Sequence, residues 1–150
     1  MPREHSSIKM DPDELRAFLA SDSRLVLATV SEDGSPWADA AACHFAGDRM
    51  YFRVPVHTRS HRHIGADPRV CVVVESKPAG TSYYDIKGAM LHGRAEPCTD
   101  PAILEALAAV PDPVDGSHDG TVYSVGLEDS TSFSFQKIQY RYQDRALNTA

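Results

Sequence analysis

The chain has 150 residues, which suits one domain or one subunit of a small oligomer, and 42% of them are apolar, enough to bury a core. Its formal net charge of −6 argues against a general nucleic-acid binder, because affinity for phosphate backbones needs a broad basic surface. No run approaches the roughly 20 apolar residues of a membrane span, and the first ten residues lack a signal-peptide core, so we expect a cytoplasmic protein without a membrane partner.

The chain opens with the pattern of a short amphipathic helix over residues 11–20. An Asp-Pro pair starts it, since aspartate is a good N-cap and proline suits the first helical position. Its apolar positions share one face: Leu15, Phe18 and Leu19. The next run, 24–30, is apolar without polar alternation, which predicts a central strand covered on both faces.

The middle of the chain predicts further strands. Residues 36–54 read as two strands joined by a Gly-Asp turn, and 70–76 as another apolar strand. The segment 83–96 predicts one long strand, in which Gly88 and Gly93 mark a sharp bend or a close approach of backbone. Such glycines are typical of a small closing barrel.

The last third of the chain predicts a second helix and two more strands. Residues 99–110 repeat the Asp-Pro start, with Ile103, Leu107 and Val110 on one face. A polar loop rich in proline and glycine, 111–120, follows and is expected to be mobile. Residues 121–127 and 132–142 then read as strands, the second with a bulge near its middle.

These elements together predict a mainly β protein. Six or seven strands with short flanking helices favour an antiparallel barrel, with helix 99–110 packed on its outside. The sequence has no internal repeat, no low-complexity tract and no linker, so we expect residues 1–150 to form a single domain.

Several catalytic patterns are absent from the sequence. There is no nucleophile elbow, no Walker loop, no dinucleotide fingerprint and no Cys-x-x-Cys pair. The carboxylates Glu32 and Asp33 fall in a turn and are interpreted as structural. Cys43, Cys71 and Cys98 are odd in number and widely spaced, which favours buried thiols over disulfides or a zinc site.

The main functional signal is a basic cluster, residues 57–70, with the sequence HTRSHRHIGADPRV. It predicts a short helix capped by Thr58 and running to about Ala66. Basic residues are unfavourable at a helix N-terminus unless an anion is present, because that end already carries partial positive charge. The hydroxyls and guanidiniums of the first turn predict a receptor for phosphate or carboxylate. These residues are Thr58, Arg59, Ser60 and Arg62.

Two other interpretations of the basic cluster stay open. The arginines can simply solvate an exposed turn, or pair with Asp48 or Asp67. A metal site is the second alternative, since three histidines lie close together, but no cysteine or carboxylate completes the ligand set and the arginines would repel a dication. The histidines are His57, His61 and His63.

The order of elements resembles the pyridoxamine 5'-phosphate oxidase-like, FMN-binding split β-barrel family. The resemblance rests on LVLATV, DGSPWADAAACHF, RMYFRV, the basic turn ending in DPRV, VCVVVE and IKGAMLHGRAE, in that order, over about residues 12–110. It implies an antiparallel split β-barrel of the Greek-key type. It also implies a homodimer with two cofactor sites at the subunit interface.

The resemblance implies a cofactor site residue by residue. Trp37, Ala38, Asp39 and Ala40 match the strand along the isoalloxazine ring. Thr58, Arg59, Ser60 and Arg62 match the site of the cofactor phosphate. Lys87 matches a strand that can approach the cofactor held mainly by the other subunit. From the residues alone, Trp37 is either a neighbour of the ring or an ordinary residue at the barrel end.

The resemblance therefore implies a flavin-dependent oxidoreductase that binds FMN and transfers a hydride to or from a small organic substrate. Many members carry a lysine in the basic turn, whereas this chain has His61 there and His63 nearby. Deazaflavin F420, with its phosphate and acidic tail, is the first alternative cofactor. A haem-binding protein without redox turnover is the next, with His57, His61 or His63 as axial ligand. No side chain is marked as a catalytic acid or base.

Overall fold

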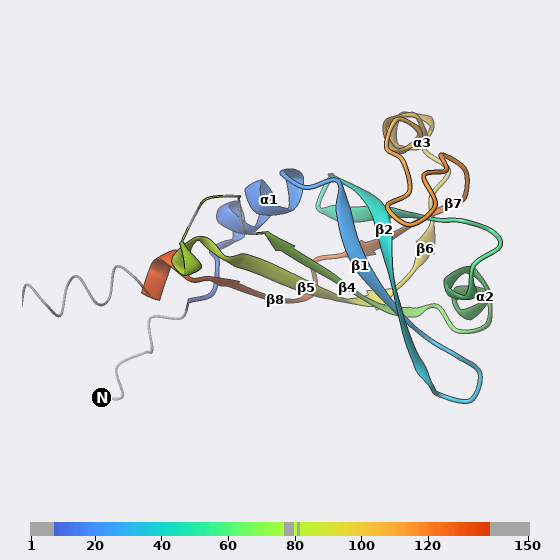
Figure 1. The fold of residues 1–150 in the computed structure, drawn as a ribbon, viewed down its shortest axis with the longest axis horizontal. Coiled ribbons are helices and arrows are strands. Elements are labelled where there is room, and N and C mark those ends of the chain that lie inside the picture. The colour runs from blue at the N-terminus through green and yellow to red at the C-terminus, as the bar shows by residue number, and fades with distance from the viewer. Residues whose placement is uncertain (1–7, 77–79, 81, 139–150) are drawn as a thin grey trace, which may run out of the picture.

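The computed structural model describes residues 8–76, 80 and 82–138, in which eight strands form one antiparallel sheet with short helices around it (Figure 1). In chain order the elements are α1 (Pro12–Ala20), β1 (Arg24–Val30), β2 (Pro36–Ala46), β3 (Arg49–Val54), α2 (Arg59–Ala66), β4 (Arg69–Ser76), the 3₁₀ helix η1 (Tyr83–Asp85), β5 (Lys87–Arg94), β6 (Glu96–Pro97), α3 (Pro101–Ala108), β7 (Thr121–Gly126) and β8 (Asp129–Ser134). The strand order is β6-β7-β3-β2-β1-β4-β5-β8.

Helix α1 forms as the sequence predicts. Asp11 is the N-cap, and its carboxylate accepts a hydrogen bond from the Glu14 backbone N–H at 2.8 Å. Leu15, Phe18 and Leu19 are buried and join the main core inside the curled sheet. In Figure 1 this helix lies over one end of the sheet, so it closes that end of the core.

Strand β1 is central, between β2 and β4, as expected, but only one of its faces is covered within the chain. Leu25 and Leu27 point into the core, whereas Val26 on the other face is 44% exposed. The prediction that both faces of this strand are covered is therefore wrong for a single chain. The apolar side chains on its second face, such as Val26, are exposed to solvent.

The β2–β3 hairpin turns at Gly47 and Asp48, whose φ angles of 55° and 60° are left-handed. Beyond the turn the alternate residues of β3 enter the core, as predicted: Met50, Phe52 and Val54. Arg53, between two of them, is only 2% exposed, which the alternating pattern did not predict.

The expected long strand 83–96 is shorter in the structure. Ser82 and Asp85 form a capping box around the 3₁₀ helix η1, so β5 begins only at Lys87. Both glycines admit close neighbours, as predicted. A Cβ at Gly88 would lie 2.4 Å from the Phe133 ring, and one at Gly93 would lie 2.8 Å from Val125 on β7, a strand that does not pair with β5.

Helix α3 packs on the outer face of the sheet through Ile103 and Leu107, as predicted, and forms a second small core there with Ala42 and Val122. The loop 111–120, expected to be mobile, is instead held by buried polar groups. The Arg53 guanidinium donates to the carbonyls of Leu107, Val110 and Ser117. Asp112 in this loop is 5% exposed and accepts from two backbone N–H groups.

The expected strand 132–142 differs most from the structure. Strand β8 ends at Ser134, and a helical turn follows in place of a bulge, with the Ile138 N–H donating to the Phe135 carbonyl at 3.0 Å. The Gln136 amide donates to the Asp85 carboxylate and the Lys137 ammonium group donates to the Lys9 carbonyl, and both bonds stabilise this turn. Tyr140 and Tyr142, expected in the same strand, lie outside the described residues.

The predicted fold class is confirmed: the structure is mainly β, and its antiparallel sheet curls into a split barrel (Figure 1). All three cysteines are free thiols, as predicted. The prediction that they are buried is confirmed only for Cys43, because Cys71 and Cys98 are partly exposed. Burial raises the pKa of the Cys43 thiol to about 12. None of the helices in the described part of the chain is long and apolar enough to cross a membrane.

Candidate functional site

Helix α2 is the element that carries the basic cluster, and it forms where the sequence predicts. Thr58 is its N-cap: the hydroxyl accepts from the His61 backbone N–H at 3.2 Å and donates to the Pro55 carbonyl at 2.7 Å. Asp67 follows the last turn, where its backbone N–H donates to the His63 carbonyl. The first turn therefore presents two arginines without any acidic residue.

A chain of contacts joins the first turn of α2 to strand β2. The Arg59 guanidinium lies 4.6 Å from the centroid of the Trp37 ring, a cation–π contact. The Trp37 indole N–H donates to the Asp39 carboxylate at 2.8 Å, and the buried Ser60 hydroxyl donates to the same oxygen at 2.6 Å. These contacts link four of the predicted site residues into one unit.

A hollow of about 570 Å³ lies between helix α2 and the β1–β2 hairpin. One wall carries Arg59, Arg62 and His63 from α2, and the other carries residues of the hairpin tip and Trp37. The hairpin projects beside α2 in Figure 1, so residues far apart in the chain meet here. The hollow is large enough for a phosphate group together with part of a larger ligand.

The two arginines of this hollow have no carboxylate partner among the described residues. Asp48 pairs with Arg16 at 2.8 Å, and Asp67 pairs with Arg69 at 2.6 Å, so neither aspartate neutralises α2. The alternative in which the arginines pair with these aspartates is wrong. Their two exposed cationic groups are therefore available to an anion.

The three histidines of the basic cluster point to three separate partners. His57 lies 3.5 Å from the Asp115 carboxylate, His61 bonds to the Thr121 hydroxyl and His63 to the Thr29 hydroxyl, both at 2.9 Å. Within the described ranges no three histidine, cysteine or acidic side chains are grouped as metal ligands. The structure thus offers no converging set for the metal-site alternative.

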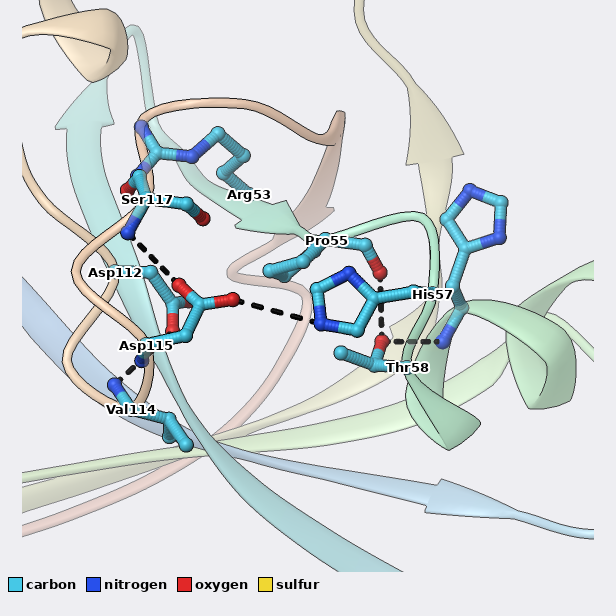
Figure 2. A network of polar contacts seen from close by, with 9 residues as sticks. Arg53, Pro55, His57, Thr58, Asp112, Val114, Asp115 and Ser117 are labelled. Atoms are coloured by element: carbon cyan, nitrogen blue, oxygen red, sulfur yellow. Dashed lines mark hydrogen bonds and ion pairs between the residues drawn. The ribbon is translucent and has the colours of Figure 1, made fainter.

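Thr58 and Ser60 face a different space from the arginines. With Asp39 they line a smaller cavity of about 90 Å³, under the loop 111–120. Figure 2 shows this region, in which the His57–Asp115 contact closes the space between the loop and the start of α2. The Thr58 hydroxyl donates to the Pro55 carbonyl and the Ser60 hydroxyl to the Asp39 carboxylate, and these bonds hold the start of the helix in place.

The remaining predicted residues lie on other surfaces. The strand alternation directs Trp37 and Asp39 toward α2, whereas Ala38 and Ala40 pair with Ala28 and Val26 on the opposite face. Lys87 lines a separate hollow near α1, together with Glu14 and Asp85. Within one chain the structure does not bring Lys87 to the arginines.

Sequence reasoning missed the acidic wall of the hollow at the arginines. Glu32 and Asp33, interpreted as turn residues only, line it opposite α2. Asp33 is also a turn residue, since it accepts from the Ser31 hydroxyl and the Ser35 backbone N–H, and these bonds lower its pKa to about 2. Nothing in the linear pattern relates this turn to a helix more than 20 positions later.

Comparison with known proteins agrees with this architecture. A family model described as pyridoxamine 5'-phosphate oxidase matches residues 11–125. No curated protein matches the chain. Among solved structures, a conserved hypothetical protein from Mycobacterium tuberculosis is 20% identical with a TM-score of 0.68, over 89% of this chain and 91% of that one.

Two further solved structures are of proteins named for the ligand that they bind. A FAD-binding protein from Mesorhizobium loti is 17% identical with a TM-score of 0.65, over 83% of this chain and 94% of that one. A haem-binding protein from Mycobacterium smegmatis is 21% identical with a TM-score of 0.58, over 81% of this chain but only 56% of that one. At these identities the likeness shows the shared fold.

Proposed function

Because the chain belongs to the pyridoxamine 5'-phosphate oxidase-like split-barrel family, we propose that it is an FMN-dependent oxidoreductase acting on a small organic substrate. The observation that carries the proposal is the pair Arg59 and Arg62, which face a hollow of about 570 Å³ without a carboxylate partner among the described residues. FAD- and haem-binding proteins of the same fold support a cofactor role for the barrel.

In this proposal the arginines hold the cofactor phosphate. Guanidinium groups bind phosphate oxygens in pairs, and charge-assisted hydrogen bonds of this kind are stronger than neutral ones. Trp37 holds Arg59 at the rim of the hollow, and Thr58 and Ser60 fix the start of α2 through Pro55 and Asp39. The residues present therefore fit a phosphate group.

We place the cofactor ring along residues 37–40, where the small side chains of Ala38 and Ala40 leave the open sheet face free for a flat group. A second copy of the chain would cover the same face. Lys87 would then act on the cofactor of the other subunit, since it lies apart from the arginines of its own chain.

When bound, FMN supplies the hydride-transfer chemistry. The chain's own residues bind and orient it: Arg59 and Arg62 at the phosphate, and residues 37–40 along the ring. We assign no side chain as a catalytic acid or base, and the protein's loops select the substrate.

An absorption spectrum and a cofactor titration test the proposal directly. The purified protein should carry a flavin spectrum or take up FMN when it is titrated. A colourless protein that binds neither FMN nor F420 would overturn it.

The arginines give a sharper test. Arg59→Ala or Arg62→Ala should weaken FMN binding by about 1.5 to 3 kcal/mol, roughly 10- to 150-fold, because each removes hydrogen bonds to a charged group. Arg94→Ala, an exposed arginine on β5 outside the hollow, is the matched control and should leave the affinity unchanged. Equal affinities in all variants would show that the cluster is only a solvated helix turn.

Two other cofactors remain as alternatives within the same barrel. F420 also carries a phosphate, and it would use the same arginines. Haem binding is favoured by one observation here, that His63 lines the hollow, although its Nδ1 is engaged by Thr29. A haem titration without a Soret shift, or a shift that survives replacement of His57, His61 and His63, would exclude haem ligation by these side chains.

A further inference from the structure

Cys71 and His92 lie side by side on the open face of the sheet. They are direct cross-strand partners on β4 and β5, and the Cys71 Sγ lies 3.8 Å from the His92 Nε2. In a tetrahedral zinc site, a sulfur and a nitrogen ligand are about 3.6 Å apart, because the two bonds to zinc are about 2.3 and 2.0 Å long. The pair therefore already has nearly the spacing of two zinc ligands.

A carboxylate follows the pair in the same row of the sheet. Asp129 on β8 is the cross-strand partner of His92, so the three side chains form one row across three strands. Burial, together with the negative charge of Asp129, raises the pKa of the Cys71 thiol. This disfavours a reactive thiolate in the protein alone. A bound cation reverses the effect, because it stabilises the thiolate and is itself attracted by the carboxylate.

One chain supplies only two of the four ligands that a structural zinc ion takes. Among the residues that the structure describes, no three histidine, cysteine or acidic side chains could together hold a metal ion, so Asp129 does not complete the set. A second copy of the pair, related by a two-fold axis, supplies the two missing ligands. The sequence did not indicate this site, because Cys71 and His92 are 21 positions apart and the other two ligands are not in the same chain.

The pair also lies near the middle of the face that a second copy would cover. Of the strands β2, β1, β4 and β5, which carry this face, β1 and β4 are the inner two. Cys71 lies on β4, between Ala28 of β1 and His92 of β5. In an isologous interface the residues closest to the two-fold axis meet their own copies, and the axis passes through the interior of the patch. Cys71 is thus well placed to meet the same residue of a second copy.

We infer that Cys71 and His92 form one half of a zinc site that joins two copies of the chain. Each chain gives one thiolate sulfur and one imidazole nitrogen to a single Zn²⁺ ion, and each thiol releases its proton to solvent as it binds. Sulfur and nitrogen ligands favour zinc over magnesium and calcium, which prefer oxygen. The inference rests on the open face being the interface between copies, and it does not depend on the proposed cofactor.

Zinc binding and oligomeric state test the inference on the full chain without a histidine tag. The protein is first treated with a chelator and then titrated with Zn²⁺ alone, with bound zinc measured by equilibrium dialysis and the dimer by sedimentation. We expect one zinc ion per two chains. The dissociation constant of the dimer should fall at least about tenfold when zinc is present, because zinc binds the dimer and not the monomer.

The variants remove one kind of ligand at a time. Cys71→Ser and His92→Gln should each weaken zinc binding at least about a hundredfold and abolish the effect of zinc on the dimer. Both side chains lie outside the core, so the fold is kept. Cys98→Ser, a partly exposed thiol that packs near α3, and His118→Gln, an exposed histidine of the loop 111–120, are the matched controls and should bind zinc as the unmodified protein does.

Zinc and FMN binding are measured separately, so the two proposals can fail independently. A dimer that takes up no zinc, or that binds it equally well in Cys71→Ser, overturns the inference and leaves the proposed function untouched. Zinc bound at one ion per chain by a monomer also overturns it. A protein that takes up zinc as expected but binds no flavin contradicts only the proposed function.

Discussion

At the scale of single residues, Trp37 has a clearer role in the structure than in the sequence. The sequence left it as either a neighbour of the ring or a residue of the barrel end. In the structure it is 36% exposed, its ring contacts Arg59, and its N–H bonds to Asp39. Trp37 is therefore a positioning residue for Arg59, whatever else it contacts.

Substitution of Trp37 tests this role. Trp37→Leu should weaken FMN binding by about 0.5 to 1 kcal/mol, the usual contribution of an exposed cation–π contact, although it removes no charge. Trp37→Phe keeps an aromatic face and should recover part of that loss. Affinities measured by dialysis would contradict the role if both variants matched the unmodified protein.

At the scale of elements, Arg53 connects strand β3 to α3 and to the loop 111–120. Its side chain is almost fully buried, and its guanidinium donates hydrogen bonds to carbonyls at the end of α3 and within the loop. Its Nε has no hydrogen-bond partner among the described residues. The cost of burying this charge is offset by three carbonyl acceptors, so the loop depends on a side chain distant in sequence.

Replacement of Arg53 should therefore lower the stability of the protein. We expect Arg53→Ala to lower the free energy of unfolding by about 3 kcal/mol or more, because it leaves buried carbonyls without donors. Arg53→Lys should recover little, since one ammonium cannot reach all three acceptors. Urea unfolding monitored by circular dichroism measures both variants, with Arg24→Ala, an exposed arginine at the start of β1, as the control. A loss below about 1 kcal/mol for Arg53→Ala would contradict the role.

A second feature at the scale of elements is the ion pair between Asp67 and Arg69, located where α2 passes into β4. The Asp67 carboxylate accepts hydrogen bonds from the Arg69 side chain and backbone, and these lower its pKa to about 2. A depressed pKa contributes stability that is present above the unfolded value of 3.8 and is lost as the pH falls toward about 2.

The acid unfolding of Asp67→Asn tests this linkage. The variant should be less stable than the unmodified protein at pH 6, and the difference should decrease between about pH 4 and pH 2, where the native carboxylate becomes protonated. Free energies of unfolding across this range provide the measurement. A difference that stays constant with pH would show that the hydrogen bonds do not depend on the charge.

At the scale of the whole molecule, the open face of the sheet favours a homodimer. Small or apolar side chains of β1, β2, β4 and β5 occupy the middle of this face and are not buried in a single chain, and the exposed side chains of Arg24, Glu75 and His92 lie around them on the same face. The small or apolar ones are Val26, Ala28, Ala38, Ala40, Cys71, Val73 and Met90. Helix α3 covers a neighbouring part of the same face, and a second copy is the cover that the family resemblance implies for the rest.

The oligomeric state tests this proposal. We expect a dimer by sedimentation or light scattering, and Val26→Glu should shift it toward monomer, because the charge would be buried at the interface. Leu104→Glu, on the exposed side of α3, is the control for an added charge at an exposed apolar site. A monomer at all concentrations, or a dimer unaffected by Val26→Glu, would contradict an interface on this face.

Local patterns in the sequence were enough to predict most of the helices and strands, and with them the fold class. Helix α1, the capped turn of α2 and the β2–β3 hairpin depend on neighbours within a few positions, so N-caps, proline and apolar alternation predict them. The order of these elements was also sufficient for the family resemblance. The end of β8 was missed because its terminating contacts, such as Gln136 with Asp85, come from distant parts of the chain.

The way in which the candidate site is assembled could be seen only in the folded chain. The arginines line one hollow while Thr58 and Ser60 line another, the three histidines have different partners, and Glu32 and Asp33 lie in the same hollow as the arginines. The structure also shows that Arg53 is buried at a position where the strand alternation predicts exposure. The physical reason is that charge pairing and burial depend on distances in space, which the curl of the sheet sets and no local pattern records.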